Sequence, residues 1–153
     1  MLFNINRANS TVSTTADTIS ITGGAVRSFL IEEYDFTGDG TASAANEIGF
    51  YRVATAGVTG GGAVVPLQVE SSVTATAFSG TVFTSWATQP AVAAAPLQIA
   101  GVNANGGSKF WRCNPNKNNA IVVPGGANAA ASISIRAVLG ASNVTARVQI
   151  NEF

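Results

Sequence analysis

Two carboxylates, Glu33 and Asp35, are the residues of this chain that come nearest to a catalytic pattern. On a β-strand, side chains two positions apart lie on the same face, so both would point the same way. Paired carboxylates can transfer protons or hold a metal ion. Glycoside hydrolysis, however, uses two carboxylates that face each other across the sugar, usually from separate strands. A carbohydrate-active enzyme that uses Glu33 and Asp35 is therefore one hypothesis.

The rest of the catalytic repertoire is sparse, because the chain contains no histidine. Ser-His and Cys-His nucleophile activation and imidazole metal ligation are excluded. Cys113 has no imidazole partner, and we expect it to be a small buried hydrophobic residue. The run from Asp35 to Gly40 lacks the alternating ligands and terminal Glu of a calcium loop, so a turn is expected. The sequence predicts no catalytic residue, no cofactor and no metal site.

Several aromatic residues could instead bind a ligand by stacking. In a β domain such residues more often anchor the core or an interface, because each buries a large area at small entropic cost. A platform for sugars or peptides is the alternative. The candidates are Trp86, Trp111, Phe110, Phe78 and Phe83.

The elements that must position these residues are strands. Short runs rich in Val, Ile, Thr and Phe are bounded by Gly, Asn, Pro and Ser, which is typical of β structure. Ile19 and Ile21 point inward in one strand. In the next, residues 27–36, Phe29, Ile31, Glu33 and Asp35 are expected on one face and Leu30, Glu32, Tyr34 and Phe36 on the other, before Thr37-Gly38-Asp39-Gly40 ends the strand. A further strand is expected over residues 47–53.

The clearest pattern is near the end of the chain. Residues 131–139 and 144–150 both alternate between apolar and polar side chains, and Gly140, Ala141 and Ser142 separate them. Two such runs joined by a short turn that contains glycine predict a β-hairpin. Short strands are also expected near residues 64–70, 74–84, 97–102, 108–113 and 120–123.

This pattern predicts an all-β fold, a single jelly-roll-like antiparallel β-sandwich of about eight strands. Residues 1–15 are expected to form an N-terminal arm or edge segment, and residues 16–153 the sandwich. A helix over residues 91–95 is disfavoured because Pro90 and Pro96 flank it.

Charge is scarce and unevenly distributed. Charged residues make up 10% of the 153 residues, against about 25% in a typical domain. Eight basic and eight acidic residues give no net charge, so nothing favours binding to nucleic acid. Between Val53 and Ser108 the only charged residue is Glu70. Soluble monomers normally mix both charge signs over their surface, so this neutral segment is expected to contact other subunits. Its apolar runs are too short to span a membrane.

Two stretches resemble small structural proteins of tailed bacteriophages: Thr41-Ala42-Ser43-Ala44-Ala45-Asn46-Glu47-Ile48-Gly49-Phe50-Tyr51-Arg52, and the segments Ala131-Ser132-Ile133-Ser134-Ile135-Arg136-Ala137, Ala141-Ser142-Asn143-Val144-Thr145 and Asn151-Glu152-Phe153. The resemblance covers about a third of the chain and includes no catalytic motif.

The resemblance implies a non-enzymatic decoration (cement) protein that binds the major capsid protein on the capsid exterior as a homotrimer. The N-terminus lacks a secretory signal, which predicts synthesis in the host cytoplasm. The N-terminal arm is expected to add a strand to a neighbouring capsid protein. The alternative within the virion is a head-fibre or tail-associated adhesin domain that binds host surface glycans.

Overall fold

The computed structural model describes residues 1–59, 62–69, 76–114, 116–126 and 131–153, which form strands and turns without an α-helix. No segment of the described chain is a helix long and apolar enough to cross a membrane. Eight of the strands in this part of the chain have four or more residues: β1 (Leu2–Thr11), β2 (Ile19–Thr22), β3 (Phe29–Asp39), β4 (Ala45–Thr55), β11 (Gln98–Asn103), β12 (Asn105–Arg112), β14 (Ser132–Leu139) and β15 (Asn143–Glu152). The shorter strands are β5 (Val58–Thr59), β6 (Ala63–Val64), β7 (Leu67–Gln68), β8 (Thr81–Phe83), β9 (Trp86–Thr88), β10 (Ala91–Val92) and β13 (Ile121–Val123).

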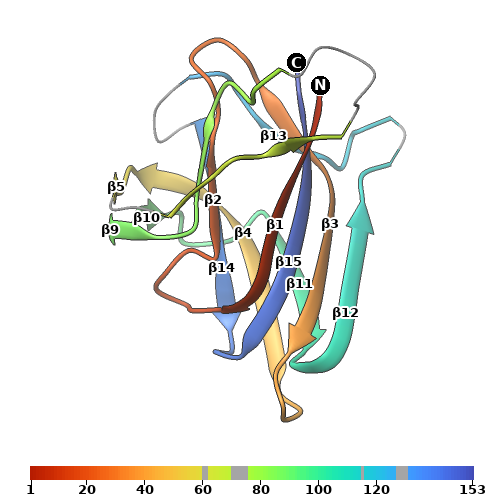
Figure 1. Cartoon of the computed structure of the whole chain (residues 1–153). Helices are drawn as coiled ribbons and strands as arrows, with labels where there is room; N and C mark the ends of the chain where they lie inside the picture. Colours follow the sequence, from red (N-terminus) through yellow and green to blue (C-terminus); the bar gives the residue numbers. More distant parts are fainter. Residues whose placement is uncertain (60–61, 70–75, 115, 127–130) are drawn as a thin grey trace.

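Two antiparallel sheets pack face to face (Figure 1). Sheet A has the order β12-β3-β15-β1-β7, with β13 also paired to β3, and sheet B has the order β10-β4-β14-β2-β8-β6, with β11 also paired to β4. The longer strands pair in a nested way, because the first pairs with the last (β1 with β15), then β2 with β14, β3 with β12 and β4 with β11. Nested antiparallel pairs wound into two sheets make a jelly roll. The predicted all-β antiparallel sandwich is confirmed, but the described residues contain more strands than the eight expected.

The core lies between the sheets and is built from the inward side chains of both. Ile133 and Ile135 of β14 and Val148 and Ile150 of β15 are fully buried there, as the alternation predicts. Ile19 and Ile21 of β2 lie in the same core. The alternation therefore identified the inward positions of these three strands correctly.

The hairpin predicted from residues 131–150 is wrong in its pairing. Both strands exist, but β14 pairs with β2 and β4 in sheet B, whereas β15 pairs with β1 and β3 in sheet A. The turn between them carries the chain from one sheet to the other, with Gly140 at a φ of +96°. A period of two determines which side chains face the core, but not which strand lies alongside.

A β-bulge in β3 changes the faces predicted for that strand. Ile31 and Glu33 lie opposite the consecutive residues Ile150 and Gln149 of β15, so Glu32 is the extra residue. The bulge reverses the alternation, so Phe29 and Ile31 are buried in the core while Glu33 and Asp35 lie on the outer face. Beyond it, Tyr34 and Phe36 face the core. The strand also continues through Thr37 and Gly38, which pair with β15, to Asp39.

Residues 2–11 are not a free arm in this structure, because they form β1 within sheet A. Eight pairs of residues join β1 to β15, with a shift in register between Arg7 and Ser10. Phe3 and Ile5 are fully buried, which ties the strand to the core. On its other side, within the part of the chain that the structure describes, β1 pairs with β7 at Phe3 and Asn4, and the N–H of Val69 donates to the carbonyl of Leu2 at 3.0 Å.

The expected short strands are found in part. Those near residues 97–102, 108–113 and 120–123 correspond to β11, β12 and β13. The described part of the strand expected over residues 74–84 contains β8. Residues 70–75, which include Glu70, lie outside the described residues. Residues 91–92 form β10, in agreement with the argument against a helix there.

Candidate functional site

Glu33 lies at the centre of an ion-pair cluster on the outer face of sheet A. It is buried, and both of its carboxylate oxygens are engaged. Arg112 of β12 donates from Nε and Nη2 to Glu33 Oε2 at 3.0 and 2.7 Å, and Arg147 of β15 pairs with Oε1. Asp35 lies on the same face, between Arg147 and Phe110 in the register of the sheet. The carboxylates are therefore on one face as predicted, but Glu33 is surrounded by cations rather than facing a second acid.

Glu32, which the bulge places beside Glu33, forms a second cluster. Its Oε1 accepts a hydrogen bond from Asn151 Nδ2 at 3.0 Å and pairs with Lys117. Lys117 has a φ of +57° in the turn after β12, and its backbone N–H donates to the carbonyl of Asn114 at 2.8 Å. Burial acts to raise the pKa of Glu32, but Lys117 and Asn151 outweigh it and hold the pKa below its ordinary value.

These clusters border a shallow cavity of about 420 Å³. At its β1 end, Gln149 of β15 donates from Nε2 to Asn4 Oδ1 at 3.1 Å. The cavity is lined by residues from four neighbouring strands and the turn after β12, namely Leu2, Glu32, Arg112, Cys113, Asn114, Lys117 and Gln149. Cys113 is a largely buried free thiol, as expected for a small hydrophobic residue. The sequence did not identify this group of residues, because they come from distant parts of the chain.

The aromatic candidates do not form one platform. Phe78 is buried against Phe3 and Phe29, and Trp111 stacks on Tyr34 with ring centroids 5.2 Å apart. Phe83 and Trp86 pack on each other at 4.8 Å. Phe110 differs from these, because it lies on the outer face of β12 with 56% of its surface exposed.

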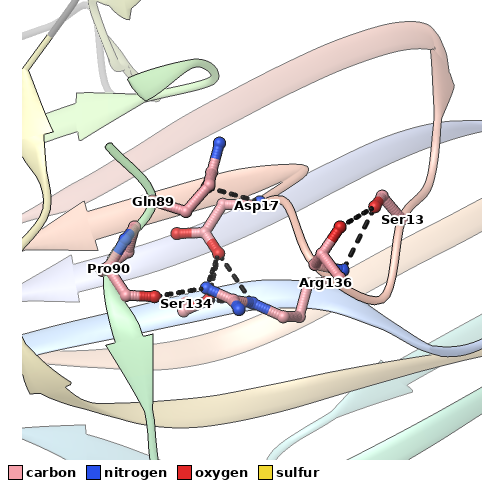
Figure 2. Close-up of polar contacts among 7 residues, drawn as sticks. Ser13, Asp17, Gln89, Pro90, Ser134 and Arg136 are labelled. Atoms are coloured by element: carbon pink, nitrogen blue, oxygen red, sulfur yellow. Dashed lines mark hydrogen bonds and ion pairs between the residues drawn. The ribbon is translucent and has the colours of Figure 1, made fainter. Parts of the chain in front are cut away.

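The outer face of sheet B contains a different kind of polar cluster (Figure 2). Arg136 of β14 donates from Nε to Asp17 Oδ1 at 2.8 Å and from Nη2 to the carbonyl oxygen of Pro90 at 3.0 Å. Ser134 also donates to Asp17 Oδ1, and the backbone N–H of Asp17 donates to Gln89 Oε1 at 3.0 Å. Asp17, Ser134 and Arg136 are all buried. Burial raises the pKa of Asp17, despite the opposing effects of Ser134 and Arg136.

Residues 89–96, here called the covering segment, lie against the polar side of β14. The segment is held by β10, which pairs with β4, and by the N–H of Ala93, which donates to the carbonyl of Arg52 at 2.9 Å. A Cβ added at Gly49 on β4 would lie 3.1 Å from Pro96 Cβ and closer still to Tyr51 and Val138. The covering segment therefore packs closely on this face.

The neutral segment is exposed over most of its described length. Large apolar side chains that face solvent there are Val58, Val65, Leu67, Val69, Leu97 and Ile99. Val65 and Leu67 are 80% and 64% exposed. Beside them a largely apolar pocket of about 260 Å³ opens between residues 63–66 and 77–83. Val65 and Leu67 lie at the edge of the sandwich where β6, β7 and β8 end the two sheets, whereas Leu97 and Ile99 lie at the opposite edge, beside or on β11.

Within the described ranges, no three or more Cys, Asp or Glu side chains come together in a way that could hold a metal ion. Comparison with known proteins adds no assignment: no family model, no curated protein and no solved structure matches this chain. The candidate surfaces are therefore three: the polar outer face of sheet A, the enclosed Asp17–Arg136 cluster, and the exposed apolar surface of the neutral segment.

Proposed function

We propose that this protein is a non-enzymatic structural component of a virus particle, a decoration protein that binds the capsid exterior as a homotrimer. The observation that carries the proposal is the set of exposed apolar side chains in the neutral segment. Exposed apolar side chains gathered at one edge, such as Val65 and Leu67 near the apolar pocket, are typical of a protein-protein interface. The resemblance of residues 41–52 and of the C-terminal segments to phage structural proteins supports a virion as the setting.

The physical basis of such a role is burial of the apolar surface. Each large aliphatic side chain moved from water into an interface contributes roughly 1.5–3 kcal/mol. Because β6 and β8 lie at one edge of sheet B and β10 and β11 at the other, a neighbour that docks its β10 and β11 edge on the apolar edge can expose its own apolar edge to a third copy. Head-to-tail contacts close into a ring when the rotation between neighbours is a whole fraction of a turn, and a ring of three matches the local threefold points of a capsid.

The proposal is tested by introducing charge into the neutral segment. The double variant Val65→Asp and Leu67→Asp places two carboxylates at exposed positions, so the monomer should still fold. We expect light scattering after size-exclusion chromatography to give a trimer for the parent chain and a monomer for the variant. The matched control is Val26→Asp, which changes a side chain that is 88% exposed outside the neutral segment and should leave the trimer intact.

Capsid binding is measured separately, by mixing the purified chain with capsids that lack it and following sedimentation and capsid melting temperature. The parent chain should sediment with the capsids and raise their melting temperature, and the double variant should do neither. A parent chain that remains monomeric at high concentration and leaves capsids unchanged would refute the proposal.

A further inference from the structure

The cavity on the outer face of sheet A has the size and composition of a small-molecule site. Its volume of about 420 Å³ lies within the range of about 300–1,000 Å³ that ligand pockets occupy. Its walls combine charged groups and amides with the apolar side chains of Leu2 and Cys113. Neither the proposed trimer nor capsid binding uses these groups, so the cavity requires an explanation of its own.

The polar groups at the cavity are held in place before any ligand arrives. Gln149 is bonded to Asn4, Arg112 is bonded to Glu33 through two N–H groups, and Glu32 accepts a hydrogen bond from Asn151. Side chains fixed in this way lose little entropy when they bind a ligand. The site is therefore organised by the sheet that carries it.

Both cations that line the cavity are already paired with carboxylates of the protein, which favours a neutral ligand. Arg112 is paired with Glu33 and Lys117 with Glu32, so an acidic ligand would have to compete with these carboxylates for the cations. What remains is hydrogen-bonding capacity. Arg112 has five N–H donors and directs two of them to Glu33, and Gln149 and Asn114 add amide groups. Hydroxyl groups both donate and accept, so a ligand rich in hydroxyls fits this mixture.

Phe110 supplies an apolar surface beside the cavity. It precedes Arg112 by two residues on β12, so both side chains lie on the outer face of the sheet. Its ring is 56% exposed, in contrast to Trp111 on the opposite face of the strand, which stacks on Tyr34. An exposed ring next to fixed hydrogen-bonding groups can pack against the C–H face of a sugar while the cavity binds the hydroxyls.

We propose that the outer face of sheet A binds a neutral saccharide, which lies along β12 from Phe110 past Arg112 into the cavity between Lys117 and Gln149. Glu33 has both oxygens in ion pairs with Arg112 and Arg147, so it is not free to act as a general acid or nucleophile, and we expect the sugar to be bound and not cleaved. This inference is independent of the virion proposal, because it concerns a different surface.

The experiment is a titration of the full, ¹⁵N-labelled chain followed by NMR. The probes are N-acetylglucosamine and the methyl glycosides of glucose, galactose and mannose, with glucuronic acid as the acidic comparison, each to about 10 mM so that millimolar dissociation constants are covered. We expect at least one neutral sugar to shift the side-chain amide signals of Gln149 and Asn114 and the Nε signal of Arg112. Absence of any such shift with all four neutral sugars would overturn the proposal, as would shifts with glucuronic acid alone.

A pair of variants separates the proposed groove from nonspecific contact with exposed apolar groups. Phe110→Ala should weaken binding of the responding sugar about tenfold, as expected for loss of an aromatic contact. The control is Leu139→Ala, which removes a side chain that is 52% exposed at the end of β14 in sheet B. Equal affinity of the Phe110 variant and the parent chain, or equal loss in both variants, would also overturn the proposal. Self-association, measured on the same samples, should be unchanged and so reports separately on the proposed trimer.

Discussion

The two outer faces of the sandwich place their charged residues in opposite environments. On sheet A, Glu33 is held by Arg112 and Arg147, whose side chains remain 67% and 46% exposed. On sheet B, Asp17 and Arg136 are enclosed beneath the covering segment, and the Arg136 side chain is only 8% exposed. Both faces therefore carry a buried carboxylate, but its guanidinium partners remain in water on sheet A and lie in the protein interior on sheet B.

This difference determines what each cluster can do. Cations that remain in water can still meet a ligand, and an exposed ion pair contributes only about 0–1 kcal/mol to stability. An enclosed pair meets no ligand, but loss of one partner leaves an uncompensated buried charge. Sheet A therefore carries the candidate binding site, while the cluster on sheet B fastens residues 13–18 and the covering segment to β14.

The largest effect is expected from breaking the enclosed pair. Arg136→Met leaves Asp17 buried without its cation and should lower the free energy of unfolding by about 3–5 kcal/mol. The matched variant on the open face is Arg147→Met, after which Glu33 keeps Arg112, and a loss of about 0–1 kcal/mol is expected. Urea denaturation measures both. Equal losses would mean that the covering segment does not isolate the Asp17–Arg136 pair from solvent.

The packing of the covering segment is tested at two glycines on neighbouring strands of sheet B. In Gly49→Ala the new Cβ would lie 2.6 Å from the Tyr51 ring and 2.8 Å from Val138 Cγ2, so side chains must move. We expect a loss of about 1–3 kcal/mol, the usual cost of overpacking. Gly101→Ala on β11 meets nothing within 4 Å and should be nearly neutral. The comparison fails if thermal or urea denaturation shows both variants to be equally stable.

A smaller effect is expected from neutralising the central carboxylate of sheet A. Glu33→Gln keeps the shape of the side chain but removes the charge between Arg112 and Arg147. Both cations can be rehydrated, so a loss of about 1–2 kcal/mol in urea denaturation is expected. A loss as large as that of Arg136→Met would show that the two faces are energetically alike.

The finest distinction is in pH dependence. The pKa of Glu32 is lowered in the folded state, so its stabilising contribution is present above its ordinary value of 4.5 and is lost as pH falls through the folded pKa. The pKa of Asp17 is raised, so its contribution is fully present below its ordinary value of 3.8 and is lost as pH rises through the folded pKa. Urea denaturation between about pH 3 and pH 7 measures both contributions. Relative to the parent chain, Glu32→Gln should lose a contribution to stability that rises with pH. Asp17→Asn should lose a contribution to stability that falls with pH. Slopes of the same sign in the two variants would contradict these assignments.

Much of the fold could be predicted from the alternation of side chains. The inward positions of β2, β14 and β15 were identified correctly, and so was the jelly-roll class. The hairpin was not, because Ile133 and Val148 face the same core from different sheets, and alternation is identical in either arrangement. The reversal of faces in β3 was also missed, since nothing in the residues around Glu32 marks a bulge before β15 is placed beside it.

The candidate site was predicted only in fragments. Glu33 and Asp35 were singled out for their spacing, yet the partners of Glu33 are Arg112 and Arg147, which are 79 and 114 positions away. The cavity residues Leu2 and Gln149 lie near opposite ends of the chain. Hydrogen-bond partners so distant in sequence become visible only when the nested strand pairs bring the chain ends together.

By itself, the amino-acid sequence determined that this chain forms strands, which side chains of most of them face the core, and that its middle is almost free of charge. These properties depend on local alternation and composition, which need no knowledge of neighbouring strands. The tertiary structure alone decided which strands pair, that Arg136 is enclosed while Arg112 and Arg147 stay in water, and that β1 belongs to the sheet. Those outcomes depend on which distant segments meet, because burial and ion pairing are properties of the assembled surroundings of a residue and not of the residue type.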